Sequence, residues 1–197
     1  NDAAEPRVTK RMLGAIEAEL GTTNAVIICD YSKGAVTQEL LDGLRALCKP
    51  RGIWLSFDPK PAHQLDLAGM SLITPNRGEL FALAGLPDEA TEASLNAAVA
   101  AVQEKFEPAI MLVTLSEHGM LLCPRGEKST VIPTVAQEIY DVSGAGDTVI
   151  ASFTLAIAAG ASPAEAAVFS NHAAGVVVGK MGTAVVTPRE LSGSFYV

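Results

Sequence analysis

Short apolar runs alternate with longer segments of helical period along most of the chain. The apolar runs end in polar or Gly/Pro-containing stretches, a pattern typical of buried strands. The predicted strands are the runs at 25–29, 53–57, 71–74 and 109–114, of which the first is expected to be covered on both faces. The predicted helices lie at 7–20, 37–48, 91–106, 145–159 and 163–179, with a short further helix ending at Leu83. This alternation predicts an α/β layer architecture around a mainly parallel sheet.

A second pattern lies between the last predicted parallel strand and the two C-terminal helices. Residues 119–123 and 128–133 are separated by Pro124-Arg125-Gly126-Glu127, which predicts a β-hairpin. No internal repeat, low-complexity tract or interdomain linker interrupts the chain. We therefore expect residues 1–197 to belong to a single domain.

Composition narrows the class of partner. The 197 residues are 49% hydrophobic, which is enough to bury a substantial core. No run of 18 or more apolar residues is free of polar breaks, so membrane-spanning helices are not expected. The 14 basic and 22 acidic residues give a net charge of −8, which repels nucleic-acid backbones. We expect neither a membrane nor a nucleic acid as partner.

Cysteine and histidine usage favours a cytoplasmic protein without a structural metal. The cysteines are odd in number and widely separated, which argues against a disulfide framework: Cys29, Cys48 and Cys123. The histidines lack metal-ligand spacing: His63, His118 and His172. No signal peptide is visible at the start of the sequence.

Polar side chains follow each of the four predicted parallel strands. In open parallel sheets, ligands bind outside the carboxyl ends of the strands, so these loops should converge on one edge. The residues concerned are Asp30, Lys33, Asp58, Lys60, Asn76, Glu79, Thr114 and Ser116.

The stretch Asp141-Val-Ser-Gly-Ala-Gly-Asp147 is predicted to be a turn that leads directly into a helix. The small residues Gly144, Ala145 and Gly146 allow three successive backbone N–H groups to approach a bulky anion. The first N–H groups of a helix lack intrahelical partners and lie at its positive end, which suits a phosphate. Asp147 stands in the first turn, where it can accept a proton from a nearby hydroxyl. A purely structural Gly-X-Gly turn is the alternative interpretation.

Together with two upstream motifs, this stretch resembles the ribokinase-like, or PfkB-type, carbohydrate kinases. The upstream motifs are Pro75-Asn-Arg-Gly-Glu79 and Val113-Thr-Leu-Ser-Glu-His-Gly119. Within that family the chain most resembles the heptose-7-phosphate kinases of lipopolysaccharide-precursor synthesis. The segments that carry this likeness are 30–34, 57–60, 72–76, 134–141 and 173–183.

The resemblance implies a three-layer α/β/α fold and ATP-dependent phosphoryl transfer to a sugar hydroxyl. Asp147 matches the catalytic base. Gly144, Ala145 and Gly146 match the anion hole for the transferring phosphoryl group. Asn76 and Glu79 match the motif that organises Mg²⁺ and the ATP phosphates, with Glu79 acting through metal-bound water. Positions that match nucleotide contacts are Thr114, Ser116, Gly119 and Asn171, with residues 131–136 along the adenine.

Further site residues are implied by the family, or allowed by their charge. Lys33 and Lys60 can add positive charge near the ATP phosphates or near a phosphate of the substrate; solvated surface lysines are the alternative. Asp141, Ser143 and Gly182 match a monovalent-cation site, such as a K⁺ site, in some relatives.

Family members carry a further N-terminal region that supplies sugar-binding residues, sheet strands and a lid. The chain is therefore expected to be the C-terminal portion of one kinase domain, its sheet incomplete at the N-terminus and its first strand uncovered on one edge. The resemblance also implies a homodimer for the full-length protein. The alternatives are a kinase for fructose, fructose phosphate or ribose, and a non-catalytic nucleotide-binding module. A Rossmann-type enzyme is disfavoured because its glycine motif should follow the first strand.

Overall fold

The computed structural model describes residues 4–60, 64–136 and 138–196, and in this part of the chain it contains a six-stranded sheet. The strands lie side by side in chain order: β1 (Ala25–Cys29), β2 (Trp54–Asp58), β3 (Leu72–Ile73), β4 (Ile110–Thr114), β5 (Met120–Pro124) and β6 (Thr130–Ile132). The first four strands pair in parallel, whereas β5 and β6 add to β4 as an antiparallel hairpin. The predicted parallel sheet and the hairpin are both confirmed.

The predicted helices are also present, with boundaries shifted by one or two residues. They are α1 (Pro6–Glu19), α2 (Gln38–Cys48), α3 (Arg77–Ala84), α4 (Glu92–Phe106), α5 (Ala145–Ala158) and α6 (Pro163–Val178). A further helix, α7 (Pro188–Ser194), was not predicted. Its start carries a recognisable signal, because Thr187 and Glu190 form a capping box around a proline at the first helical position.

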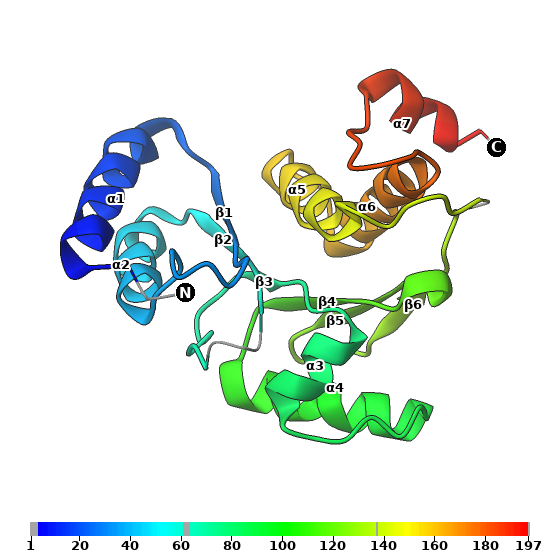
Figure 1. The fold of residues 1–197 in the computed structure, drawn as a ribbon, viewed down its shortest axis with the longest axis horizontal. Coiled ribbons are helices and arrows are strands. Elements are labelled where there is room, and N and C mark those ends of the chain that lie inside the picture. The colour runs from blue at the N-terminus through cyan, green and yellow to red at the C-terminus, as the bar shows by residue number, and fades with distance from the viewer. Residues whose placement is uncertain (1–3, 61–63, 137, 197) are drawn as a thin grey trace.

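Two apolar layers hold the helices against opposite faces of the sheet. Along β4, Met111 and Val113 join the core beneath α2, α3 and α4, whereas Ile110 and Leu112 join the core beneath α5 and α6. This division follows from the two-residue period of a strand, which sends successive side chains to opposite faces. Figure 1 shows α3 and α4 on one side of the sheet and α5 and α6 on the other. The α/β/α layering is confirmed.

The first strand departs from the expectation of burial on both faces. β1 is the end strand of the sheet, and Ile27 is 40% exposed. Its neighbour β2 is paired on both sides and is largely buried. The expectation of an uncovered edge is confirmed, whereas burial on both faces was wrong, because an apolar run indicates a strand but does not reveal which elements pack against its faces.

Helix length and the state of the cysteines can be compared with the expectations from composition. In the described residues, no helix is long and apolar enough to cross a membrane. All three cysteines are free thiols, as expected from their spacing. His63 lies outside the described residues.

Candidate active site

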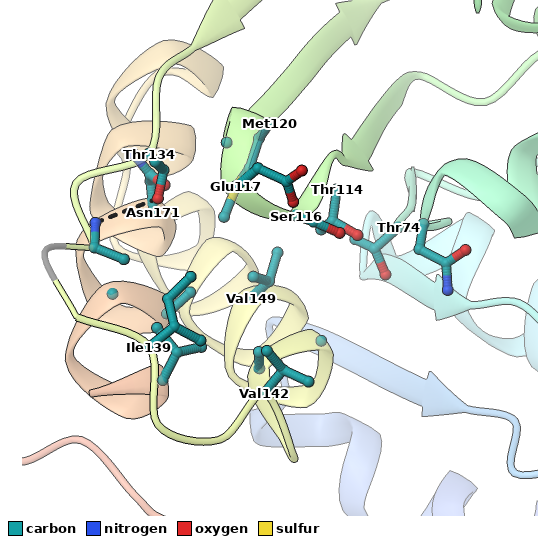
Figure 2. Close-up of a pocket in the computed structure, with 18 of the residues that line it drawn as sticks. Thr74, Thr114, Ser116, Glu117, Met120, Thr134, Ile139, Val142, Val149 and Asn171 are labelled. Carbon is teal, nitrogen blue, oxygen red and sulfur yellow. Dashed lines mark hydrogen bonds between the residues drawn. The ribbon is translucent and has the colours of Figure 1, made fainter. Parts of the chain in front are cut away.

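A cavity of about 450 Å³ lies where the carboxyl ends of the parallel strands meet the start of α5. The loops after β2, β3 and β4 contribute to this first cavity, together with the glycine turn and α6. The predicted site residues that line it are Lys60, Asn76, Glu79, Thr114, Ser116, Gly119, Ala145, Gly146 and Asn171. Figure 2 shows Thr74, Thr114 and Ser116 on one side of the cavity, and Ile139, Val142 and Val149 on another. The expected convergence is therefore present for the loops after β2, β3 and β4, whereas Asp30 and Lys33 of the loop after β1 do not line this cavity.

The motif after β3 forms the N-terminus of α3. The Asn76 side chain accepts a hydrogen bond from the Glu79 N–H at 2.9 Å, and the Glu79 carboxylate accepts one from the Asn76 N–H at 2.9 Å. This reciprocal capping box satisfies two N–H groups that the helix itself leaves unpaired. A bridge between Asn76 and Thr114 places the β3 and β4 loops side by side. The two predicted residues thus have a structural role before any ligand is considered.

A charged cluster occupies the floor of the first cavity beside α3. Lys60 Nζ lies 2.5 Å from Glu79 Oε1 and 3.5 Å from Asp58 Oδ2, and Thr74 donates to Asp58 Oδ1 at 3.3 Å. Burial raises the pKa of Asp58 to about 6, and the charge of Glu79 raises it further, whereas Lys60 opposes the shift. Lys60 is therefore the internal counter-ion of two carboxylates. Thr74 was not predicted as a site residue, although it directly follows a strand.

The start of α5 differs from a normally capped helix. Gly144 is the N-cap residue with φ 81°, in the left-handed region that favours glycine, and no side chain caps the helix. The Ala145 N–H donates to the Val142 carbonyl at 3.1 Å, so the turn itself uses one of the three amides predicted to face an anion. No acceptor is found among the described residues for the N–H groups of Gly144 and Gly146. Two of the three amides predicted to bind an anion, those of Gly144 and Gly146, are thus left available.

Asp147 lies on the other side of the glycine turn. With Gly144 it lines a second, mostly apolar cavity of about 850 Å³ between α5 and residues 183–195. The Tyr31 hydroxyl donates to Asp147 Oδ1 at 2.8 Å. Burial raises the pKa of the neighbouring Cys29 thiol to about 11, and the Asp147 charge adds to the shift. Tyr31 was not predicted as a site residue, although it follows the first strand and lies in segment 30–34, which carries part of the family resemblance.

Close packing shapes the opposite end of the first cavity. Gly119 has φ 85°, and a Cβ atom there would lie 2.1 Å from the Ile132 carbonyl oxygen, so only glycine fits. Asn171 is buried, and its Nδ2 donates to the Pro133 carbonyl at 2.6 Å. Both residues therefore fix the segment after β6, whose Thr134 and Ala136 line the cavity.

The remaining predicted site residues fall into two groups. Asp141 accepts a hydrogen bond from the Ser143 N–H at 2.8 Å, and bonds from Ser143 and from the Gly182 backbone hold the pKa of Asp141 below its usual range. These three residues are thus brought together. Lys33 is exposed and lines neither of the two cavities described above.

The donor atoms of the first cavity suit Mg²⁺ better than a softer metal. In the described part of the chain, no group of three or more His, Cys, Asp or Glu side chains could enclose a metal ion. The cavity instead offers oxygen donors from Asp58, Glu79 and Asn76. Mg²⁺ keeps much of its hydration and takes one or two carboxylates together with substrate phosphates, so this sparse oxygen set fits it.

Comparison with known proteins identifies the family. Residues 2–190 match the model of the pfkB family carbohydrate kinases, and the chain belongs to that family. PfkB kinases use ATP and Mg²⁺. The bifunctional protein HldE of Sulfurimonas denitrificans is 41% identical over 180 residues, which are 91% of this chain and 37% of that protein. HldE of Edwardsiella ictaluri is 42% identical over 186 residues, which are 93% and 38% of the respective chains. This chain thus spans less than two-fifths of these relatives.

Solved structures show the same fold. The ribokinase of Arabidopsis thaliana, in complex with ribose and ATP, superposes with a TM-score of 0.79 at 22% identity; the match covers 100% of this chain and 61% of the ribokinase. Phosphofructokinase-2 from Escherichia coli, in complex with potassium, gives a TM-score of 0.82 at 19% identity and covers 98% and 63%. At these identities the likeness establishes a ribokinase-like fold.

Proposed function

We propose that this chain is the C-terminal portion of a kinase domain that transfers the γ-phosphoryl group of ATP to a sugar hydroxyl. The proposed substrate is a heptose 7-phosphate, phosphorylated at its anomeric hydroxyl to the 1,7-bisphosphate on the route to ADP-heptose. The observation that carries the proposal is the uncapped start of α5, which contributes Ala145 and Gly146 to a cavity shared with Asn76 and Glu79. The heptose assignment is supported by the sequence resemblance and by about 40% identity to HldE proteins.

The proposed roles follow from the contacts of each residue. The adenine end of ATP lies against the segment fixed by Gly119 and Asn171, and the phosphates extend toward the start of α5. The free N–H groups of Gly144 and Gly146 stabilise charge that develops on the transferring phosphoryl oxygens. The Asp147 carboxylate accepts the proton of the sugar hydroxyl as the sugar oxygen bonds to the γ-phosphorus and ADP leaves.

Charge neutralisation completes the proposed site. Mg²⁺, held by Glu79, Asn76 and Asp58, would neutralise phosphate charge when bound. Lys60 adds a fixed positive charge beside these carboxylates. Asp141, Ser143 and Gly182 form a proposed monovalent-cation site next to the glycine turn, supported by the interactions of Asp141 with Ser143 and with the Gly182 backbone.

The test is a substrate panel with ATP and Mg²⁺ on the longest native form of the protein and on its Asp147→Asn variant. We expect heptose 7-phosphate to be turned over faster than fructose, fructose 6-phosphate or ribose. Asn at position 147 can still accept the Tyr31 hydrogen bond, so the variant should fold and bind ATP. Its kcat should fall by roughly 10²–10⁴, because the general base is lost.

A matched control is Asp42→Asn, which alters an exposed carboxylate on α2 and should leave turnover unchanged. Equal turnover by the Asp147→Asn variant would refute the role of Asp147. ATP binding without turnover of any sugar would favour a non-catalytic nucleotide-binding module. Preference for fructose, its phosphate or ribose would keep the kinase and replace the heptose.

A further inference from the structure

The loop after β1 holds its aromatic residue in a defined place. Asp30 is buried, and its N–H donates to the Asp58 carbonyl at 3.2 Å. The Ser32 N–H donates to Asp30 Oδ1 at 2.8 Å, and Ser32 adopts φ 55°, a conformation uncommon outside glycine. Tyr31 therefore lies between a buried anchor and a tight side-chain turn.

The Tyr31 side chain depends on one polar contact for its orientation. Its surface is 59% exposed, so apolar burial contributes little to fixing the ring. Its hydroxyl donates to Asp147 Oδ1 at 2.8 Å, although the two residues are 116 positions apart in the sequence. Hydrogen bonds to an ionised carboxylate are shorter and stronger than those between neutral groups. This contact joins the loop after β1 to the first turn of α5.

We propose that Tyr31 is a positioning residue that holds the Asp147 carboxylate in the orientation in which it accepts the proton of the sugar hydroxyl. The inference rests on the proposed function, and it adds a residue to that site. Asp147 lies in the first turn of α5, and the small residues before it offer few side-chain contacts of their own. The Tyr31 hydroxyl supplies this contact from the loop after β1.

The protonation states of the neighbours agree with this role. The hydrogen bond to Asp147 raises the pKa of Tyr31 to about 12, with burial as the second cause. Burial raises the pKa of Cys29 to about 11, and the charge of Asp147 adds to the shift. Neither group gives up its proton near neutral pH, so the Tyr31 hydroxyl remains a donor to the carboxylate and no thiolate competes with it.

The first experiment compares Tyr31→Phe with Tyr140→Phe in the longest native form of the protein. Tyr31→Phe keeps the ring and removes only the O–H. We expect kcat to fall about tenfold with the KM for ATP unchanged, in line with the loss of one hydrogen bond to a charged group. Tyr140 is also exposed, and its hydroxyl donates to Glu138 Oε2 at the same 2.8 Å, but it lines neither cavity. Its variant should match the wild type.

The second experiment follows the contact without using activity. The tyrosinate absorbance of each protein is titrated with alkali, and the Tyr31→Phe curve is subtracted to isolate Tyr31. We expect Tyr31 to ionise at a lower pH in the Asp147→Asn variant than in the wild type, because the carboxylate that raises its pKa is gone. An unchanged Tyr31 titration would show that the contact does not exist in solution and would overturn the inference.

The outcomes separate this inference from the proposed function. Wild-type turnover of a sugar together with full or increased kcat in Tyr31→Phe would overturn the positioning role and leave the kinase intact. An increase would indicate that Tyr31 obstructs the acceptor. A wild type that phosphorylates no sugar would remove both proposals, whatever the titration shows.

Discussion

Two helices begin at the first cavity, and their N-termini are built in opposite ways. At α3, Asn76 and Glu79 satisfy each other's backbone N–H groups in a capping box. At α5, Gly144 provides no side chain, and the N–H groups of Gly144 and Gly146 have no acceptor among the described residues. Side-chain caps also close α2, α4, α6 and α7. Among the described α-helices only α1, which begins at a proline, shares with α5 a start without a side-chain cap.

This difference indicates which helix end is available to a ligand. A side-chain cap stabilises its helix by about 1 kcal/mol relative to alanine but by only a few tenths relative to glycine, so Gly144 leaves the start of α5 open at little cost. An anion at the same place would satisfy the free N–H groups and interact favourably with the helix dipole. The closed end of α3 presents side-chain oxygens of Asn76 and Glu79 instead, which suit a hydrated cation. We therefore propose that the two N-termini provide complementary sites, that of α5 for phosphate and that of α3 for a hydrated cation.

Closing the open terminus should have the largest effect. Gly144→Asp places an acidic cap on α5, and aspartate tolerates a positive φ better than most residues. We expect kcat/KM for ATP to fall by about 10²–10³, because the anion-binding amides are capped and a like charge is introduced. Steady-state kinetics and calorimetric ATP binding measure the effect.

Strain must be separated from charge in that variant. A Cβ atom at position 144 would lie 3.3 Å from Thr183 Cγ2, a tight contact that requires a small shift. Gly160, after the other end of α5, also has a positive φ, with open space around it. Gly160→Asp should leave kcat/KM unchanged. ATP turnover by Gly144→Asp at the wild-type rate would contradict an anion site at this terminus.

The carboxylates beside α3 should give an effect of intermediate size on stability. The pKa of Asp58 is about 6 in the folded protein and near 3.8 when unperturbed, so between these values the folded state binds more protons. The contribution of Asp58 to the free energy of unfolding therefore falls as pH rises from about 4 to about 6. Two pKa units correspond to about 3 kcal/mol.

The Asp58→Asn variant isolates this contribution. Its free energy of unfolding, measured by urea titration at several pH values, should change less between pH 4 and 6 than that of the wild type. The difference between the two curves cancels most other titrating carboxylates. Parallel curves would mean that Asp58 is not the group that titrates with a raised pKa.

The smallest effect is expected at the closed terminus itself. Asn76→Ala should lower the free energy of unfolding by about 1 kcal/mol, and Asn76→Ser should restore it, since serine is also a good N-cap. If Asn76 additionally contacts the Mg²⁺–ATP complex, both variants should weaken ATP binding. Thr91→Ala removes a cap on α4, which does not line the first cavity, and should lower stability alone. If Asn76→Ser binds ATP with wild-type affinity, Asn76 acts only as the N-cap of α3.

Much of the fold followed from the sequence because its signals are local. The strands at 25–29 and 110–114 are apolar runs, and α3 and α5 start at recognisable residues, Asn76 and Gly144. The expectation that loops after several strands share one site needed only the geometry of a parallel sheet. Asn171 and Gly119 were matched to the nucleotide by resemblance, and the structure adds their packing against the segment after β6.

The rest depends on contacts between distant parts of the chain. The hydrogen bond between Tyr31 and Asp147 joins residues that no local pattern connects. The exposure of Ile27 depends on which strand lies beside β1, and the use of the Ala145 amide by Val142 depends on the turn geometry. Lys60 was placed in the site by its position after a strand, but its role as counter-ion of two carboxylates emerged only in three dimensions.

The strand order of the sheet has a consequence for engineering. The strands β1 to β4 are parallel and lie side by side in chain order. The loops that follow them therefore form a row in the same order. The first loop of this row reaches Asp147, whereas the second, third and fourth line the first cavity. Exchanging residues of the first loop should therefore retune which alcohol is accepted while the donor end is preserved. We expect that the choice of sugar acceptor and the binding of ATP can then be changed independently of each other.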